Sequence, residues 1–312
     1  MSRKASNIAE LARHGVSVPE GFHLDQSHYR EAIEPVQHSL LAVARDAAAA
    51  QRIFAAIKLP DRTSRALRDG LRAIRSQSNL AVRSSGNVVA RGQSIAEDGG
   101  ELSLAGQFES FLNVPRDHVE DAVRLCWASL FNERSVQVFE VDEGYVANSA
   151  MTVLVQEMVP AAASAVVMTV DPLGDGTVGG IELAVGACEA IVGGAVSPDE
   201  VTFDRASGLI VERHVGAKEF AIEYRPFARG SDNVIKKPLP QTVREQLAVT
   251  DSVLMKIIDV ARHIETIFGV PQDIELVVNA AGNITVVQAR SITRLPEKFI
   301  PFKSTMVETF TR

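Results

Sequence analysis

The stretch from 273 to 292, DIELVVNAAGNITVVQARSI, limits the fold of this chain more than any other. Two apolar runs, 276–278 and 284–287, flank the short break Ala280-Ala281-Gly282-Asn283. Apolar runs separated by a short, glycine-containing break are typical of a β-hairpin. The sequence therefore predicts an antiparallel hairpin near the carboxyl end of the chain.

Polar side chains stand at the open end of this predicted hairpin. Folding the arms about the Ala281-Gly282 turn places Glu275 opposite Gln288, and Asp273 opposite Arg290. Side chains alternate along a strand, so one face of the hairpin should carry a defined set of residues. We expect that face to carry residues 275, 277, 286, 288 and 290.

A carboxylate, an amide and a guanidinium at one hairpin end suit a metal bound to a polyphosphate. Carboxylate and amide oxygens suit Mg²⁺, which usually takes one or two protein ligands and leaves its other positions to phosphate and water. Arginine offers a planar fork for phosphate oxygens. The alternative interpretation is a solvated hairpin end with a surface ion pair, and these residues alone leave both open.

The order of predicted elements indicates an α+β protein. The first third is mainly helical, and valine-rich strands follow at 151–159, 164–172 and 179–185. A helix is predicted from Thr250 to Phe268, with Gly269 ending it. Helices first and a mostly antiparallel set of strands afterwards favour α+β over alternating α/β.

Charge and cysteine content exclude several functional classes. The formal net charge of -7 argues against a nucleic-acid partner, because nucleic-acid binders usually present a basic face. Cys126 and Cys188 are isolated and fit neither a metal site nor a disulfide framework. The start, MSRKASNIAE, does not read as a signal peptide, and no apolar run approaches the roughly 18 residues of a membrane span. We expect a cytoplasmic protein with no membrane partner.

Two further segments are candidates for phosphate binding. Arg83-Ser84-Ser85-Gly86 follows an apolar strand, so a guanidinium, two hydroxyls and loop amides can converge on an anion. The segment Gly106 to Ser110, GQFES, is a candidate glycine turn where backbone approaches a ligand. The sequence lacks GxxxxGK[ST], and its seven histidines do not cluster. Its one GxGxxG, at 174–179, leads into the strand predicted at 179–185 and not into a helix, so it is not the dinucleotide-binding motif. Taken singly, each segment is equally compatible with an ordinary turn.

Several segments in a fixed order carry a resemblance to a known family. They are KASNIAELARHGVSVPEGF near the start, then AVRSS, LAGQFESFLNV, CWASLF, VLVQEMV and GAVSPDEVTFDR, and finally HIETIFGVPQDIEL followed by VVQARSIT. Together they resemble the ATP-binding domain of the phosphoenolpyruvate synthase and pyruvate phosphate dikinase family, a domain also found in rifampin phosphotransferase. The resemblance runs along almost the whole chain.

The resemblance implies an α+β fold of the ATP-grasp type, with largely antiparallel sheets, flanking helices and two lobes that hold MgATP. We accordingly expect a mainly helical amino-terminal lobe at 1–147, whose loop 83–113 covers the phosphates. The carboxy-terminal ATP-grasp lobe would span 148–295, and 296–312 would form a short tail.

The resemblance also implies ATP and Mg²⁺ as cofactors and a role for each matching position. The implied roles are phosphate binding by Lys4 and Arg83, covering of the phosphates by Gly106 and Ser110, adenine binding by Gln156, Glu157 and Val159, Mg²⁺ binding by Glu275 and Gln288, charge neutralisation on the phosphates by Arg290, and catalysis by Arg83 and Arg290.

The family reaction moves the β,γ-pyrophosphoryl unit of ATP to a histidine on a swivelling domain. Residues 291–312 contain no Thr-Ser-His-Ala segment of such a domain. We therefore expect a stand-alone, dikinase-like ATP-binding subunit whose acceptor is a separate phosphohistidine-bearing or substrate-bearing protein. Two alternatives stay open: an ATP-dependent ligase or kinase that activates a small-molecule acceptor, and a non-catalytic ATP-binding regulatory protein.

Overall fold

The computed structural model describes residues 3–90, 93–96, 108–139, 141–225 and 234–292. The chain divides into two compact units. Unit 1 comprises Met1–Ser6, Pro19–Met158 and Tyr224–Asn233, and unit 2 comprises Asn7–Val18, Val159–Glu223 and Val234–Arg312. The boundary expected after residue 147 differs from this division, because the strand that follows it belongs to unit 1.

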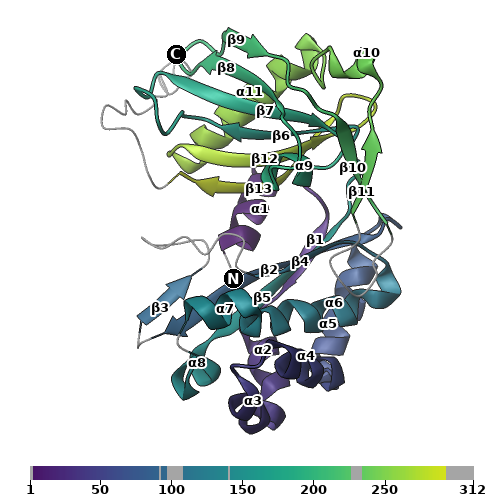
Figure 1. Cartoon of the computed structure of the whole chain (residues 1–312), viewed down its shortest axis with the longest axis vertical. Helices are drawn as coiled ribbons and strands as arrows, with labels where there is room; N and C mark the ends of the chain where they lie inside the picture. Colours follow the sequence, from purple (N-terminus) through teal and green to yellow (C-terminus); the bar gives the residue numbers. More distant parts are fainter. Residues whose placement is uncertain (1–2, 91–92, 97–107, 140, 226–233, 293–312) are drawn as a thin grey trace, which may run out of the picture. The chain divides into compact units, whose positions relative to one another are not determined.

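Unit 1 is built on a five-stranded sheet with helices around it (Figure 1). Its strands follow the order β1-β5-β2-β3, and β4 also pairs with β2. The strands are β1 (Gly21–Leu24), β2 (Leu80–Ala90), β3 (Gln93–Ala96), β4 (Ser110–Val114) and β5 (Ala150–Glu157). The α-helices are α2 (Gln26–Ile33), α3 (Gln37–Val43), α4 (Ala47–Ala56), α5 (Asp61–Ala73), α6 (Val119–Ala128), α7 (Glu133–Val138) and α8 (Glu143–Asn148). Short 3₁₀ turns lie at Glu34–Val36, Arg116–His118 and Ser129–Phe131.

Strand β2 extends further than the sequence suggested. We expected a short strand that gives way to the covering loop from residue 83, whereas β2 continues to Ala90. It pairs with β5 from Leu80 opposite Glu157 to Asn87 opposite Ala150. Val88 is fully buried, so the apolar pattern continues past the glycine and sustains the strand.

Aromatic side chains fill the core of unit 1. Trp127 of α6 lies edge-on to Tyr29 of α2, with ring centroids 6.0 Å apart. Phe131 bridges Phe54 and Tyr145 at 5.8 and 5.9 Å. All five rings are fully buried, so this cluster anchors the helices on the sheet that carries Arg83 and Gln156.

Unit 2 is built on a six-stranded antiparallel sheet with the order β13-β12-β6-β7-β8-β9. Its strands are β6 (Ala163–Met168), β7 (Val178–Val185), β8 (Asp199–Asp204), β9 (Ile210–His214), β12 (Gln272–Val278) and β13 (Ile284–Ser291). A separate two-stranded sheet joins β10 (Phe220–Tyr224) to β11 (Val234–Pro238). The helices are α9 (Glu189–Val192), α10 (Gln241–Arg244) and α11 (Asp251–Phe268), with most of α1 (Arg3–Arg13).

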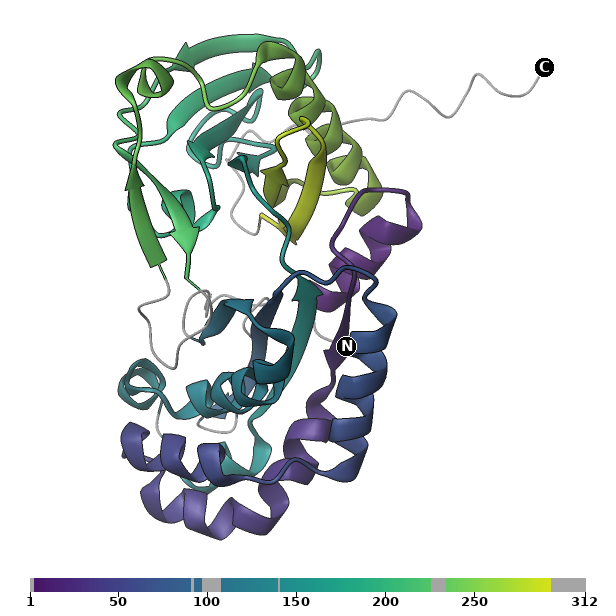
Figure 2. The same cartoon turned by 90° about the vertical axis from the view of Figure 1, so that its right-hand side faces the viewer.

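Helix α11 covers one face of the six-stranded sheet (Figure 2). The helix predicted from Thr250 to Phe268 is confirmed, and Gly269 ends it in the left-handed region at φ 68°. Leu254, Ile257, Ile258, Ala261 and Ile264 of α11 pack on Ala165, Ile181, Val201, Ile274 and Leu276 of the strands. The alternate residues of these strands consequently point to the opposite face of the sheet.

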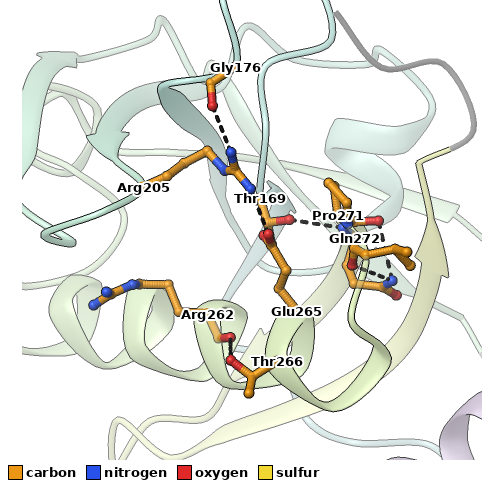
Figure 3. Close-up of polar contacts among 9 residues, drawn as sticks. Thr169, Gly176, Arg205, Arg262, Glu265, Thr266, Pro271 and Gln272 are labelled. Atoms are coloured by element: carbon orange, nitrogen blue, oxygen red, sulfur yellow. Dashed lines mark hydrogen bonds and ion pairs between the residues drawn. The ribbon is translucent and has the colours of Figure 1, made fainter. Parts of the chain in front are cut away.

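A buried ion pair fastens α11 to the loops at one end of this sheet (Figure 3). Arg205, which follows β8, donates to Glu265 of α11 at 2.6 Å and to the Gly176 carbonyl at 2.6 Å. Both charged side chains are about nine-tenths buried. Thr169 lies beside them and accepts a hydrogen bond from the Gln272 amide at 2.9 Å. These contacts fix the start of β12, the strand that carries Glu275.

The α+β class expected from the sequence is confirmed by these helices and antiparallel sheets. None of the described helices combines the length and the apolar character that crossing a membrane requires.

Candidate nucleotide and metal site

The end of the β12–β13 hairpin brings together the carboxylate and the amide that the sequence singled out. Glu275 is opposite Gln288, and Asp273 is opposite Arg290, which is the predicted register. The Gln288 side-chain amide donates to Glu275 Oε1 at 2.9 Å. Gln288 is 9% exposed, so the pair lies partly buried at the sheet surface. The two side chains proposed as metal ligands are therefore in direct contact.

One residue of the expected face is misplaced in our prediction. We expected Val286 to share a face with Glu275 and Gln288, but Val286 is fully buried in the core formed with α11. The register shifts between Glu275 and Leu276, because the pairs change from 275–288 to 276–286. The extra residue, Val287, forms a β-bulge and reverses the alternation on its side of the hairpin.

Arg290 lies on the same face and is held by a carboxylate. Its Nε and one terminal nitrogen donate to Asp273 Oδ2 at 2.9 and 2.7 Å. The Arg290 side chain is 44% exposed, whereas that of Asp273 is 13% exposed. Arg290 is thus oriented by Asp273 and partly exposed, and an oriented guanidinium suits the binding of an anion.

Two more carboxylates lie in the same row across the sheet. Glu275 is opposite Val166, Val166 is opposite Glu182, and Glu182 is opposite Glu200. At about 4.8 Å between strands, Glu182 lies about 10 Å from Glu275 along the row. Partial burial, with repulsion from Glu200 and Asp273, raises the pKa of Glu182 above its ordinary value. This face of unit 2 therefore holds excess negative charge that a cation would relieve.

The donor set at the hairpin end fits Mg²⁺ better than it fits a transition metal. Within the described residues, no group of three or more His, Cys, Asp or Glu side chains is arranged to enclose a metal ion. Glu275 and Gln288 supply two hard oxygen ligands, which matches the one or two that Mg²⁺ takes when phosphate and water complete its shell. A thiolate or imidazole site would need a different set of side chains.

Unit 1 holds the predicted phosphate-binding residues next to one another. Arg83 of β2 is opposite Ser110 of β4, so their side chains share a face of the sheet. Lys4, near the start of α1, donates from Nζ to the Ser84 carbonyl at 3.2 Å. Lys4 thus lies beside the Arg83 segment although 79 positions separate them in the sequence. Gly106 lies outside the described residues.

The predicted adenine-binding residues end strand β5. Gln156 is 2% exposed, and among the described residues its Nε2 has no hydrogen-bond partner. A buried amide without a partner is costly, which is consistent with a ligand that completes it. Glu157 is partly buried, and its Oε1 accepts from the Glu20 amide at 3.0 Å. Val159, the first residue of unit 2 after this strand, is partly buried.

Sequence reasoning missed several residues at these sites. Asp273 was placed opposite Arg290 but given no role, although the register alone implied an ion pair. Glu182 stands at an outward position in the alternating segment GGIELAV, and this alternation is the signal that identifies it. Glu20, which binds Glu157, lies 137 positions away in the chain and left no local signal.

Residues 3–308 match the family described as pyruvate phosphate dikinase, AMP/ATP-binding domain. The match covers nearly the whole chain and includes both units. It therefore assigns the chain to a nucleotide-binding family independently of the geometry described above.

Curated relatives extend well beyond this chain. A probable phosphoenolpyruvate synthase of Methanothermobacter thermautotrophicus is 32% identical over 307 residues, which cover 94% of this chain and 44% of that protein. A rifampicin phosphotransferase of a Streptomyces species is 33% identical over 310 residues, covering 94% of this chain and 34% of that protein. The chain thus spans less than half the length of these relatives.

Among solved structures, the VanG D-Ala:D-Ser ligase of Enterococcus faecalis matches 93% of this chain and 52% of that chain. The sequence identity is 10% and the TM-score is 0.37. At this level the likeness carries no argument about function.

Proposed function

Because this chain belongs to the family of the pyruvate phosphate dikinase AMP/ATP-binding domain, an α+β domain of the ATP-grasp type, we propose that it binds MgATP and transfers a phosphoryl or pyrophosphoryl group to an acceptor on a separate protein. The observation that carries this proposal is the contact between Glu275 and Gln288, with Arg290 on the same face. A solvated hairpin end does not require a carboxylate in contact with a buried amide.

Unit 2 supplies the metal ligands and one phosphate-binding cation in this proposal. Glu275 and Gln288 hold Mg²⁺, which neutralises phosphate charge when it is bound. Arg290, oriented by Asp273, donates to the phosphate oxygens and stabilises the charge that develops during transfer. Catalysis at such a site consists mainly of positioning and electrostatic stabilisation.

Unit 1 supplies the remaining nucleotide contacts. Lys4 and Arg83 bind phosphates, and Ser110 beside Arg83 takes part in covering them, together with Gly106. The buried Gln156 donates its unpartnered Nε2 to the base. Glu157 and Val159 are proposed to contact the base as well.

The acceptor is the second part of the proposal. We propose that the acceptor is a histidine or a substrate that lies outside the ATP-binding domain, because the matching domain makes up only 44% and 34% of two relatives. We place the protein in the cytoplasm, in keeping with two buried cysteines that are not joined in a disulfide.

Phosphorus NMR tests this function directly. The chain would be incubated with ATP and Mg²⁺, alone and with a separately produced histidine-bearing domain of the family. We expect ATP consumption only when the domain is present, and strongly slowed consumption with Arg290→Ala. Equal consumption without the domain, unchanged in Arg290→Ala, would contradict the proposed transfer.

A further inference from the structure

The end of β5, proposed above to bind adenine, is held on both sides by backbone contacts. The Glu157 amide donates to the Glu20 carbonyl at 2.8 Å, and the Met158 amide donates to the Asn79 carbonyl at 2.8 Å. The Glu157 carboxylate in turn accepts a hydrogen bond from the Glu20 backbone amide at 3.0 Å. Glu157 is thus committed to Glu20 through both its backbone and its side chain.

Glu20 is itself fixed by an arginine from a distant loop. Arg75 donates from Nε to Glu20 Oε1 at 2.7 Å and from its backbone amide to Oε2 at 2.8 Å. These hydrogen bonds from Arg75 lower the pKa of Glu20, so the carboxylate stays ionised at neutral pH. The pair ties the residue before β1 to the segment that follows α5.

Gly21, next to Glu20, makes room for Gln156. It is opposite Gln156 in the pairing of β1 with β5. A Cβ added at Gly21 would lie 2.5 Å from the Val155 carbonyl oxygen and 3.0 Å from Gln156 Cγ. Any side chain at position 21 would displace the strand or the glutamine. Gly21 therefore allows the buried Gln156 side chain to keep its conformation.

We infer that Glu20, Gly21 and Arg75 are positioning residues for base recognition, which hold Gln156 and Glu157 where they select adenine over guanine. This inference rests on the proposed ATP site. Its physical reason is that Gln156, next to Glu157, presents a buried donor without a partner, and a base is discriminated only if the group that faces it is held in a fixed geometry. None of the three positioning residues needs to touch the nucleotide.

Arg75 is the best position for a substitution that tests this role alone. Its side chain is 88% exposed, so its removal leaves the core intact. Calorimetry would give the dissociation constants for ATP and GTP of the wild type, Arg75→Ala, Arg75→Lys and Glu20→Gln. Arg72→Ala is the matched control, since Arg72 is an exposed arginine three positions away that faces Asp69 at 3.6 Å. Amide NMR shifts of Glu157 and of the Gln156 side chain would report their positions directly.

We expect Arg75→Ala and Glu20→Gln to weaken ATP binding by about threefold to tenfold, the range for loss of one hydrogen-bonded contact. In both variants the ratio of the GTP to the ATP dissociation constant should fall towards one, and the NMR signals of Glu157 and Gln156 should shift. Arg75→Lys should bind ATP more tightly than Arg75→Ala does. Gly21→Ala should narrow the preference further, if it folds. Arg72→Ala should match the wild type.

The outcomes separate this inference from the proposed function. If the wild type binds ATP, and Arg75→Ala and Glu20→Gln keep its ATP affinity and its preference for ATP over GTP, the positioning role is wrong. The proposed ATP site is then not contradicted. If the wild type binds no ATP, the proposed function fails and the inference fails with it.

Discussion

Glu275 and Gln288 contact each other across β12 and β13, with the glutamine amide donating to the carboxylate at 2.9 Å. This contact orients the two groups relative to each other. The amide nitrogen is engaged with Glu275, and the amide oxygen is the atom that Mg²⁺ would use. The site is therefore organised by the same two residues that are proposed to bind the ion.

Replacing Gln288 by methionine tests the amide oxygen as a metal ligand. Methionine keeps the length of the side chain but offers no hard oxygen, so the Mg²⁺ concentration needed for half-maximal ATP binding should rise about tenfold or more. Fluorescence titration of Mg²⁺ at fixed ATP would measure it. Gln272→Met, at the buried start of β12, is the control that separates lost ligation from a disturbed strand. An unchanged Mg²⁺ requirement in Gln288→Met would contradict the assignment.

Glu182 provides a test of the crowded charge on this face. Its pKa is raised in the folded state, so its ionisation opposes folding once the pH exceeds its unfolded pKa, near 4.3. Glu182→Gln should therefore increase the free energy of unfolding at pH 7 by up to about 0.5 kcal/mol. Below about pH 4 the difference should vanish, because the wild-type carboxyl is then protonated in both states.

Urea denaturation at the two pH values would measure this difference. Glu212→Gln, on the edge strand β9, is the matched control. A loss of stability in Glu182→Gln at pH 7 would show that the carboxylate is stabilised by its surroundings and not repelled by them.

The Arg205–Glu265 pair should show strong coupling. Replacing either partner alone leaves an uncompensated buried charge, which costs about 3–5 kcal/mol of unfolding free energy. Arg205→Met with Glu265→Leu removes both charges and should cost clearly less than the sum of the single changes. A double-mutant cycle by chemical denaturation measures the coupling. Additive losses would mean that the two charges do not interact in solution.

Asn279 controls the turn of the hairpin that carries the metal ligands. Its Oδ1 accepts from the amides of Ala281 and Asn283, each at 3.0 Å. Asn279→Ala should lower the free energy of unfolding by about 1 kcal/mol, whereas Asn279→Asp keeps the acceptor and should lower it less. Thermal unfolding of the three proteins checks this order. Equal stability of wild type and Asn279→Ala would show that these two hydrogen bonds do not stabilise the turn.

The hairpin register was predictable because its cause is local. Alternating apolar residues and a short turn near Gly282 set which residues meet, and Glu275 and Gln288 met as expected. The bulge at Val287 was not predictable, because it arises where Val286 and Ala289 both pack on α11. Tertiary packing determines the position of the bulge, and the sequence of the hairpin alone does not reveal it.

Polar contacts between residues far apart in the chain also could not be predicted from the sequence. Glu20 and Arg75 are 55 positions apart, and neither lies in a recognisable motif. Lys4 and Ser84 are brought together only by the way the start of α1 lies beside β2. The family resemblance placed Lys4 and Arg83 in one role, whereas residue patterns alone gave no reason to join them.

Calorimetric titration with ATP, with and without Mg²⁺, tests the central claim most directly. The proteins are the wild type, Glu275→Ala, Arg290→Ala and the control Glu212→Ala. The proposed site predicts Mg²⁺-dependent binding to the wild type and to the control, weakened in both site variants. Two results would contradict a metal–polyphosphate site at the end of the β12–β13 hairpin. One is no binding at millimolar ATP, and the other is an ATP affinity that changes neither with Mg²⁺ nor with either site substitution.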